Sequence, residues 1–100
     1  MGAFVYILRC NDGSYYVGSA TGNDLSLRVD EHNAGKHPGY TFKRRPVTLA
    51  WSEHFDRITD AISVERQIKG WSRAKKAALI QGDWGKVRDL SRRRAGRSKI

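Results

Sequence analysis

The strongest constraint on the fold of this chain is a β-hairpin signal near its N-terminus. Residues 3–9 alternate with the two-residue period of a strand, and residues 14–20 supply a returning strand. The segment between them, residues 11–14, reads Asn-Asp-Gly-Ser, which favours a tight turn between antiparallel strands. Both faces of the first strand are apolar, so we expect it to be central in a sheet. The hairpin would place the hydroxyls of Tyr6 and Tyr16 at matched positions.

A helix is predicted directly after the hairpin. Asn23 or Asp24 is a suitable cap, and apolar residues recur at three- and four-residue intervals through about residue 33. Gly35 would end this helix. The spacing puts Arg28 and His32 on the same side of the helix, one turn apart.

The second half of the chain is predicted to add one strand and two helices. A basic loop over residues 35–46 leads into a strand over residues 47–55. Thr59 or Asp60 begins a helix that carries Glu65 and Lys69 one turn apart, a spacing at which an ion pair is the default. Ser72 caps a further helix that runs through residue 80.

These elements indicate an α/β fold of the α+β type, in the order β-β-α-β-α-α, with a small central three-stranded antiparallel sheet flanked by helices. The length of 100 residues fits one domain. We expect residues 1–82 to form it and residues 83–100 to form a basic, partly disordered C-terminal extension. A short helix is expected around residues 84–90, and the arginine-rich run after it is expected to be disordered when free.

Composition restricts the class of protein. Nineteen Lys and Arg against ten Asp and Glu give a formal charge of +9, which favours an anionic partner such as a nucleic acid. No apolar run is long enough to cross a bilayer, so no membrane partner is expected. The lone Cys10 cannot form an internal disulfide and indicates a reducing compartment. We therefore expect a cytoplasmic protein.

Several short motifs taken together resemble the GIY-YIG nuclease domain. Tyr6 matches the end of that family's first motif, and the segment Tyr-Val-Gly at residues 16–18 matches the second. The runs at residues 12–14, 31–35, 44–46 and 65–76 resemble its small, single-domain bacterial branch more closely. The similarity covers about residues 3–80, and its motifs are specific in combination.

The resemblance implies cleavage of a nucleic-acid phosphodiester with one divalent metal, Mg²⁺ or Mn²⁺, and no small-molecule cofactor. A hard cation that keeps several waters needs few protein oxygens, so Glu65 is the expected metal ligand. Arg28 suits the charge that develops on phosphorus. The catalytic candidates are Tyr6, Tyr16, Arg28, His32 and Glu65. One of Tyr6, Tyr16 or His32 would accept the proton of the attacking water, with His32 alternatively bonded to Tyr16.

Further residues are candidates for contact with nucleic acid, with DNA favoured as the partner. They are Gly18, Lys36, Tyr40, Lys43, Arg44, Arg45, Lys69 and Arg73. Many family members carry a lysine soon after the second motif, where this chain reads Ser-Ala-Thr at residues 19–21. Lys69 or Arg44 is our hypothesis for its replacement. His37 and His54 have no predicted partner.

The leading hypothesis is a DNA endonuclease that selects substrate structure rather than sequence, since backbone contacts position a protein without specifying a sequence. Two alternatives retain the fold. One is a nucleic-acid-binding module without turnover, and the other is an RNA- or ribosome-associated protein, which the arginine-rich run would suit.

Overall fold

The computed structural model describes residues 2–22 and 24–98. They divide into two compact units, one ending at Gly70 and the other beginning at Trp71. The first unit holds the strands β1 (Ala3–Arg9), β2 (Tyr15–Thr21) and β3 (Thr48–Phe55). It also holds the helices α1 (Leu25–Asn33) and α2 (Ile58–Lys69), and the short 3₁₀ turn η1 (Phe42–Arg44). The second unit holds α3 (Arg73–Ile80) and α4 (Trp84–Ser98).

The three strands form one antiparallel sheet in the order β2-β1-β3. The predicted hairpin and the central place of β1 are therefore confirmed. Gly13 takes a positive φ of 85° in the turn, and the Asp12 carboxylate accepts a hydrogen bond from the backbone N–H of Ser14. These contacts are the reason that an Asp-Gly sequence closes the hairpin.

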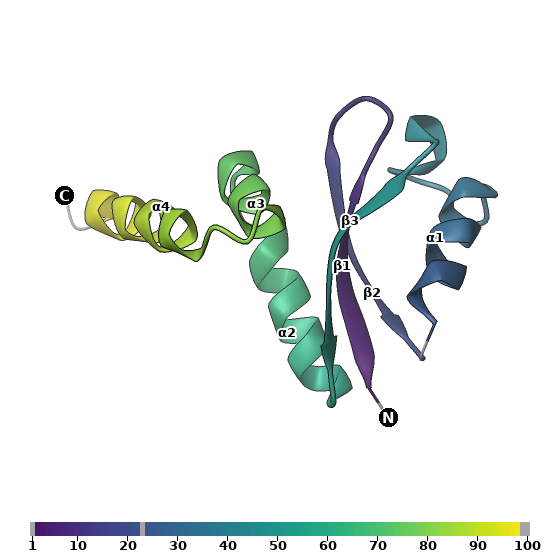
Figure 1. Ribbon diagram of the computed structural model, residues 1–100, viewed down its shortest axis with the longest axis horizontal. Helices are drawn as coiled ribbons and strands as arrows, with labels where there is room; N and C mark the ends of the chain where they lie inside the picture. Colours follow the sequence, from purple (N-terminus) through teal and green to yellow (C-terminus); the bar gives the residue numbers. More distant parts are fainter. Residues whose placement is uncertain (1, 23, 99–100) are drawn as a thin grey trace. The chain divides into compact units, whose positions relative to one another are not determined.

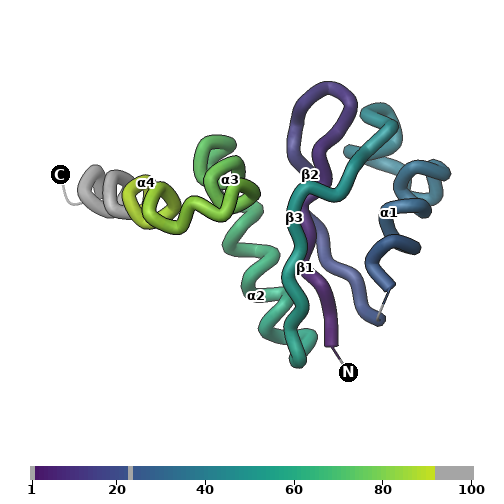
Figure 2. Tube along the Cα trace, viewed as in Figure 1, coloured from purple at the N-terminus to yellow at the C-terminus, as the bar shows by residue number. Residues whose placement is uncertain are grey.

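A helix covers each face of the sheet. α1 lies on one side and α2 on the other (Figures 1 and 2). On the α1 side, a buried cluster combines residues of β1, β2 and α1 with Cys10, which follows β1, and Val47, which precedes β3. Its members are Tyr6, Leu8, Cys10, Ala20, Leu25 and Val47. Because successive side chains of β1 point to opposite faces of the sheet, Tyr6 faces α1 and Val5 lies on the other face.

Local capping explains where the helices begin. The Asp24 side chain accepts hydrogen bonds from the N–H groups of Ser26 and Leu27 at the start of α1. Ser72 caps α3 in the same way, through Lys75. α2 starts slightly earlier than predicted, at Ile58. The side chain of Asn33 bonds both the N–H and the C=O of Val47, which ties the end of α1 to the start of β3.

The second unit is a pair of helices, α3 and α4, with Leu79 and Val87 among their buried residues. α4 reaches Ser98, well beyond the short helix predicted around residues 84–90. Its backbone therefore includes most of the run for which disorder was predicted, and arginine and alanine are good helix formers, which accounts for the difference. Residues 99 and 100 lie outside the described part of the chain. Within the described ranges, no helix combines the length and apolar character that a membrane span requires.

Candidate active site

A chain of three buried polar side chains lies between the sheet and α1. The Tyr6 hydroxyl is 3.1 Å from Nε2 of His32, and Nδ1 of the same ring is 2.9 Å from the Thr41 hydroxyl. Each of the three residues is only 2% exposed. They come from β1, α1 and the loop before η1, so this contact joins three separate segments of the first unit.

Burial determines the protonation state of His32 and Tyr6 in this hydrogen-bonded series. Loss of solvent, with the charges of His37 and Arg28 in support, lowers the pKa of His32 to about 4, so its ring is neutral at pH 7. A neutral imidazole has one donor and one acceptor nitrogen, so one hydroxyl donates to the ring and the other accepts from it. Burial is also the main cause that raises the pKa of Tyr6 to about 12.

Gly18 is what leaves room for the Tyr6 hydroxyl. It pairs with Tyr6 across the hairpin and is buried. A Cβ atom at this position would lie 2.6 Å from the Tyr6 hydroxyl oxygen and 2.7 Å from its Cζ atom, which is closer than real Cβ contacts. The absence of a side chain at Gly18, the glycine of the second motif, therefore leaves space for the Tyr6 ring beside the paired strand.

Tyr16 forms the more exposed part of the aromatic cluster. Its ring lies edge-on to His32, with 5.4 Å between centroids, and is stacked on Tyr40 at 6.1 Å with an interplanar angle of 26°. Tyr16 is half-buried, whereas Tyr6 is fully buried. The alternative in which His32 bonds Tyr16 is wrong, because the ring nitrogens of His32 face Tyr6 and Thr41 instead.

Arg44 holds Tyr40 in place. Its guanidinium carbon lies 3.9 Å from the centroid of the Tyr40 ring, and Nη1 donates to the Tyr40 carbonyl at 2.8 Å. Nε of Arg44 donates to the Asp12 carboxylate at 3.0 Å. The hairpin turn, Arg44, Tyr40 and Tyr16 thus form one continuous set of contacts.

Arg28 projects from α1 with about a third of its side chain exposed. Its Nε lies 3.7 Å from Oε1 of Glu31, and the same oxygen is 3.1 Å from Nε2 of His37. Arg28 and Glu31 also line a small cavity of about 180 Å³ beside the end of β2. The His37 ring lies tilted against the His32 ring, with 4.4 Å between centroids and an interplanar angle of 33°. The prediction that His37 has no partner is therefore wrong.

Glu65 reaches the site from the opposite layer of the first unit. It lies on α2, where Oε1 accepts a hydrogen bond from the Ser19 hydroxyl at 2.9 Å and Oε2 is 3.0 Å from Nζ of Lys69. Ser19 follows Gly18 on the edge strand β2, so Glu65 contacts this strand from the α2 face of the sheet, whereas Tyr6 and Tyr16 lie on the α1 face. The negative charge of Glu65 raises the pKa of Tyr6, and the positive charge of Arg28 lowers it.

The carboxylate of Glu65 is chemically suited to hold a hard divalent cation. Its side chain keeps 16% of its surface exposed, and a carboxylate has more lone pairs than the two donors present here use. Among the residues that the structure describes, no group of three or more His, Cys, Asp or Glu side chains gathers around a common point. A cation at Glu65 would therefore take its remaining ligands from phosphate and water.

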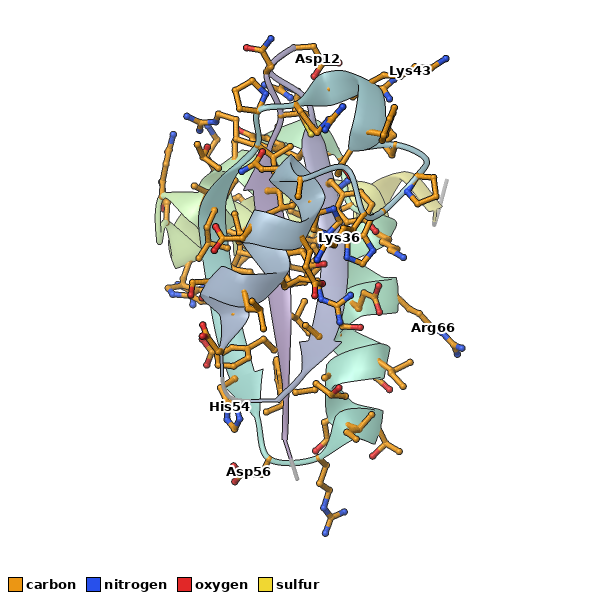
Figure 3. The ribbon with its side chains drawn as sticks, turned by 90° about the vertical axis from the view of Figure 1, so that its right-hand side faces the viewer. Asp12, Lys36, Lys43, His54, Asp56 and Arg66 are labelled. Carbon is orange, nitrogen blue, oxygen red and sulfur yellow. The ribbon has the colours of Figure 1, made fainter. Side chains whose placement is uncertain are left out.

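The other predicted contacts for nucleic acid occupy several places. Lys36 and Lys43 are exposed, and Lys43 lies near Asp12 at the end of the first unit away from His54 and Asp56 (Figure 3). Arg45 is held by the carbonyls of Phe42 and Asn33. Arg73 begins α3 in the second unit and is exposed. His54, for which no partner was predicted, contacts the Phe4 ring edge-on and lies 3.9 Å from Asp56.

Two residues of this site were missed at the sequence level. Thr41 lies in the basic loop, and its bond to His32 depends on the path of that loop. Glu31 is one residue before His32 and joins Arg28 to His37. The three-residue spacing of Arg28 and Glu31 is a helical ion-pair signal that could have identified Glu31, whereas no local pattern indicates Thr41.

The chain is similar in sequence to one protein family and to several known proteins. The model of the GIY-YIG catalytic domain family matches residues 2–78. A UPF0213 protein of Halobacterium salinarum is 49% identical over 76 residues, which cover 76% of this chain and 96% of that protein. A UPF0213 protein of Staphylococcus aureus is 44% identical over 78 residues, covering 78% and 93% respectively.

Two solved structures have a similar fold. The solution structure of a UPF0213 protein from Bacillus halodurans gives a TM-score of 0.53 at 38% identity, covering 81% of this chain and 84% of that one. The solution structure of a protein from E. faecalis gives a TM-score of 0.56 at 33% identity, covering 82% and 85%.

Proposed function

Because the chain belongs to the GIY-YIG catalytic domain family, we propose that it is a divalent-metal-dependent endonuclease that hydrolyses phosphodiester bonds in DNA. The observation that supports this proposal is that three of the candidate groups lie beside one strand: Tyr16 is on β2, Arg28 lines the cavity at its end, and Glu65 accepts a hydrogen bond from its Ser19. Tyr6 is buried next to Tyr16, and burial is the main cause that raises its pKa, with Tyr16 and Glu65 adding to the rise and Arg28 opposing it. Selection of substrate structure rather than sequence is part of the proposal.

Exposure suggests how the roles divide. Tyr16, Arg28 and Glu65 each keep part of their side chain accessible, so we assign them direct contact with the substrate. Tyr6 and His32 are 2% exposed and bonded to each other, so we assign them the positioning of the aromatic cluster. Arg28 would bind the scissile phosphate and stabilise the charge that builds on it.

We assign proton transfer from the attacking water to Tyr16 because it is the most accessible of the three candidates. An ordinary phenol is a poor base near pH 7, so Arg28 and the divalent cation would have to stabilise its phenolate. A pKa of about 12 leaves almost no phenolate at Tyr6 near neutral pH, and a pKa of about 4 makes His32 a weak base. Neither residue exposes enough surface to meet a water at the phosphate.

Glu65 would hold the divalent cation, Mg²⁺ or Mn²⁺. Such a cation, when bound, neutralises phosphate charge and stabilises the leaving oxygen. Lys69 already pairs with Oε2 of Glu65, so it would move aside or contact the phosphate when the cation is present.

A nicking assay with Mg²⁺ and a panel of branched, single-stranded and duplex DNA tests this function. Glu65→Gln keeps the shape of the side chain and its bond to Ser19 but removes the charge, so we expect cleavage to fall at least 100-fold, about the contribution of one electrostatic group. Glu53→Gln, an exposed glutamate on β3, is the matched control and should cut normally. Equal cutting by the Glu65→Gln variant and the unmodified protein would refute the proposal.

A further inference from the structure

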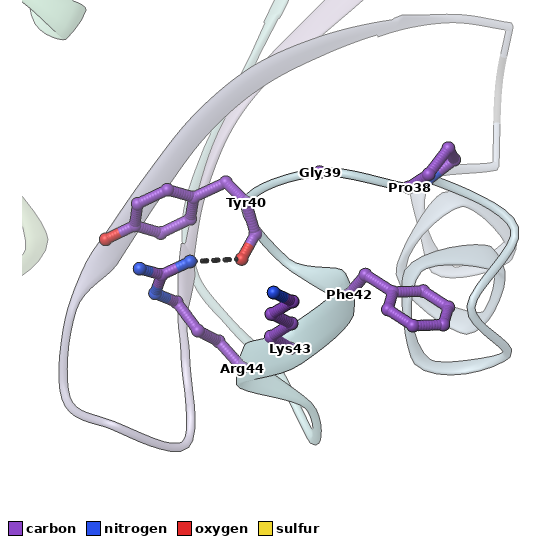
Figure 4. A pocket seen from close by; sticks show the side chains of 6 residues that line it. All are labelled: Pro38, Gly39, Tyr40, Phe42, Lys43 and Arg44. Atoms are coloured by element: carbon purple, nitrogen blue, oxygen red, sulfur yellow. Dashed lines mark hydrogen bonds between the residues drawn. The ribbon is translucent and has the colours of Figure 1, made fainter.

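The loop between α1 and β3 forms an open, shallow pocket that the proposed chemistry does not use. It has a volume of about 490 Å³, within the range of small-molecule sites, and six residues of the loop line it: Pro38, Gly39, Tyr40, Phe42, Lys43 and Arg44. Figure 4 shows Tyr40 and Phe42 on opposite sides of it, with Lys43 between them.

The lining combines aromatic surface with positive charge. Tyr40 and Phe42 are each 42% exposed, which is high for aromatic side chains of this size. Lys43 is exposed, and Arg44 is half-exposed at the rim. Aromatic rings that offer a stacking surface beside cations are the pattern by which proteins bind unpaired nucleotides, because the ring takes the base and the cation takes the phosphate.

The pocket also adjoins the candidate active site. Tyr40 forms one wall, and its ring is stacked on Tyr16. The position of this wall is fixed, since Arg44 lies over the Tyr40 ring and bonds both the Tyr40 carbonyl and the Asp12 carboxylate. A nucleotide in the pocket would therefore be a close neighbour of a phosphate held at Tyr16.

We propose that this pocket binds an unpaired nucleotide of the substrate strand next to the phosphate that is cut. The inference rests on the proposed function and specifies its substrate as DNA with a junction between paired and unpaired strands. A base inside a duplex has both faces stacked and its edge paired, so it cannot enter a pocket in a protein loop unless it is flipped out.

Phe42 supplies the stacking surface. The Tyr40 ring already contacts both Arg44 and Tyr16. Arg45 lies over the Phe42 ring, at 4.4 Å from the ring centroid, and the Phe42 side chain still keeps 42% of its surface exposed. We assign the base to the other face of Phe42 and the phosphate to Lys43.

Binding without metal tests this assignment, because it does not depend on cleavage. Fluorescence anisotropy in EDTA would compare a DNA duplex with the same duplex extended by a single-stranded arm. A third probe, in which the single-stranded extension is RNA, shows whether the pocket takes an unpaired nucleotide of DNA or of RNA. We expect Phe42→Ala to weaken binding to the armed DNA by about five- to 150-fold, the usual effect of losing one stacked base. Its binding to the plain duplex should change less than about twofold, because no base is stacked there.

Leu49→Ala is the matched control, because Leu49 is an equally exposed apolar residue on β3 outside the pocket. It should bind both probes normally. Phe42→Leu keeps apolar volume without an aromatic face, and it serves if the alanine variant does not fold. It should also lose most of the preference for the armed DNA.

Equal losses on the armed and plain duplexes, or no loss on either, would overturn the inference. The two proposals can fail separately. Metal-dependent cutting without a preference for unpaired strands would remove the pocket assignment and leave the nuclease. A Phe42-dependent preference for unpaired strands in a protein that never cuts would support the pocket assignment and refute the nuclease.

Discussion

The hydroxyl of Tyr6 lies 3.1 Å from Nε2 of His32, and both residues are almost fully buried. This bond fixes the inner side of the aromatic cluster, on which the half-buried Tyr16 packs. The candidate site therefore has an inner part that is fixed by packing and an outer part, made of Tyr16, Arg28 and Glu65, that solvent can reach.

Gly18→Ala should disturb the inner part. The new methyl group would lie 2.6 Å from the Tyr6 hydroxyl oxygen, and the paired strands cannot move apart, so the Tyr6 ring must shift away from His32. We expect a loss of roughly 1–3 kcal/mol in the free energy of unfolding, typical of overpacking. Urea denaturation measures it. In Gly85→Ala the new atom would meet, among the side chains that the structure describes, Asp83 alone, at 3.6 Å, so this control should be neutral or slightly stabilising. Equal stability of the Gly18→Ala variant and the parent would contradict the packing argument.

The stability of the protein should fall in mild acid because of His32. Its pKa is lowered from 6.5 to about 4 in the folded chain, so the unfolded chain binds more protons between these values. The contribution of His32 to the free energy of unfolding is therefore fully present above pH 6.5. It is lost as the pH falls toward 4, by up to about 3 kcal/mol.

Urea denaturation at several pH values between 4 and 7 measures this loss. His32→Gln should flatten the pH dependence, because glutamine does not titrate. His54→Gln removes a more exposed histidine of the same unit and should keep the slope. If the His32→Gln variant kept the slope of the parent, another group would be responsible.

Arg44→Lys should impair the site although it keeps the charge. A lysine cannot lie flat on the Tyr40 ring while bonding both Asp12 and the Tyr40 carbonyl, as the guanidinium does. We expect kcat to fall about tenfold, roughly one cation–π contact, with a smaller change in KM. Arg9→Lys, which alters an arginine over Tyr15 at the hairpin, is the control and should be neutral. Full activity of Arg44→Lys would mean that Arg44 acts only through its charge.

Lys69→Ala tests whether Lys69 replaces the lysine that many family members carry after the second motif. Its Nζ is 3.0 Å from Glu65, so it both supplies a cation near the site and competes with a metal for the carboxylate. Cleavage measured against Mg²⁺ concentration should show a lower maximal rate and a lower half-saturating concentration. Arg66→Ala removes the same charge from a side chain that points outward from α2 (Figure 3). Unchanged rates in Lys69→Ala would exclude the replacement.

Much of the fold could be predicted because its signals are local. The Asp-Gly turn, the Asp24 and Ser72 caps and the period of β1 each act within a few residues, and the structure confirms all of them. The family resemblance also holds over residues 2–78. The length of α4 was underestimated because like charges were given more weight than the helix propensity of arginine.

The site was less predictable because its contacts join distant segments. The bond between His32 and Thr41 depends on a loop path that no sequence period encodes. The approach of Glu65 from the α2 layer depends on how a helix packs on an edge strand. The catalytic roles of Tyr6, Tyr16, Arg28, His32 and Glu65 stay predictions until the variants are assayed.

Thr41 gives the loop over residues 35–46 a second significance. The segment that would touch substrate through Phe42 and Lys43 also supplies the inner hydrogen-bond partner of His32. Exchanging this loop between homologues would therefore change recognition and the buried proton network in one step. Chimeras that graft the loop alone, without matching changes around His32, should be poor nucleases even where the graft folds.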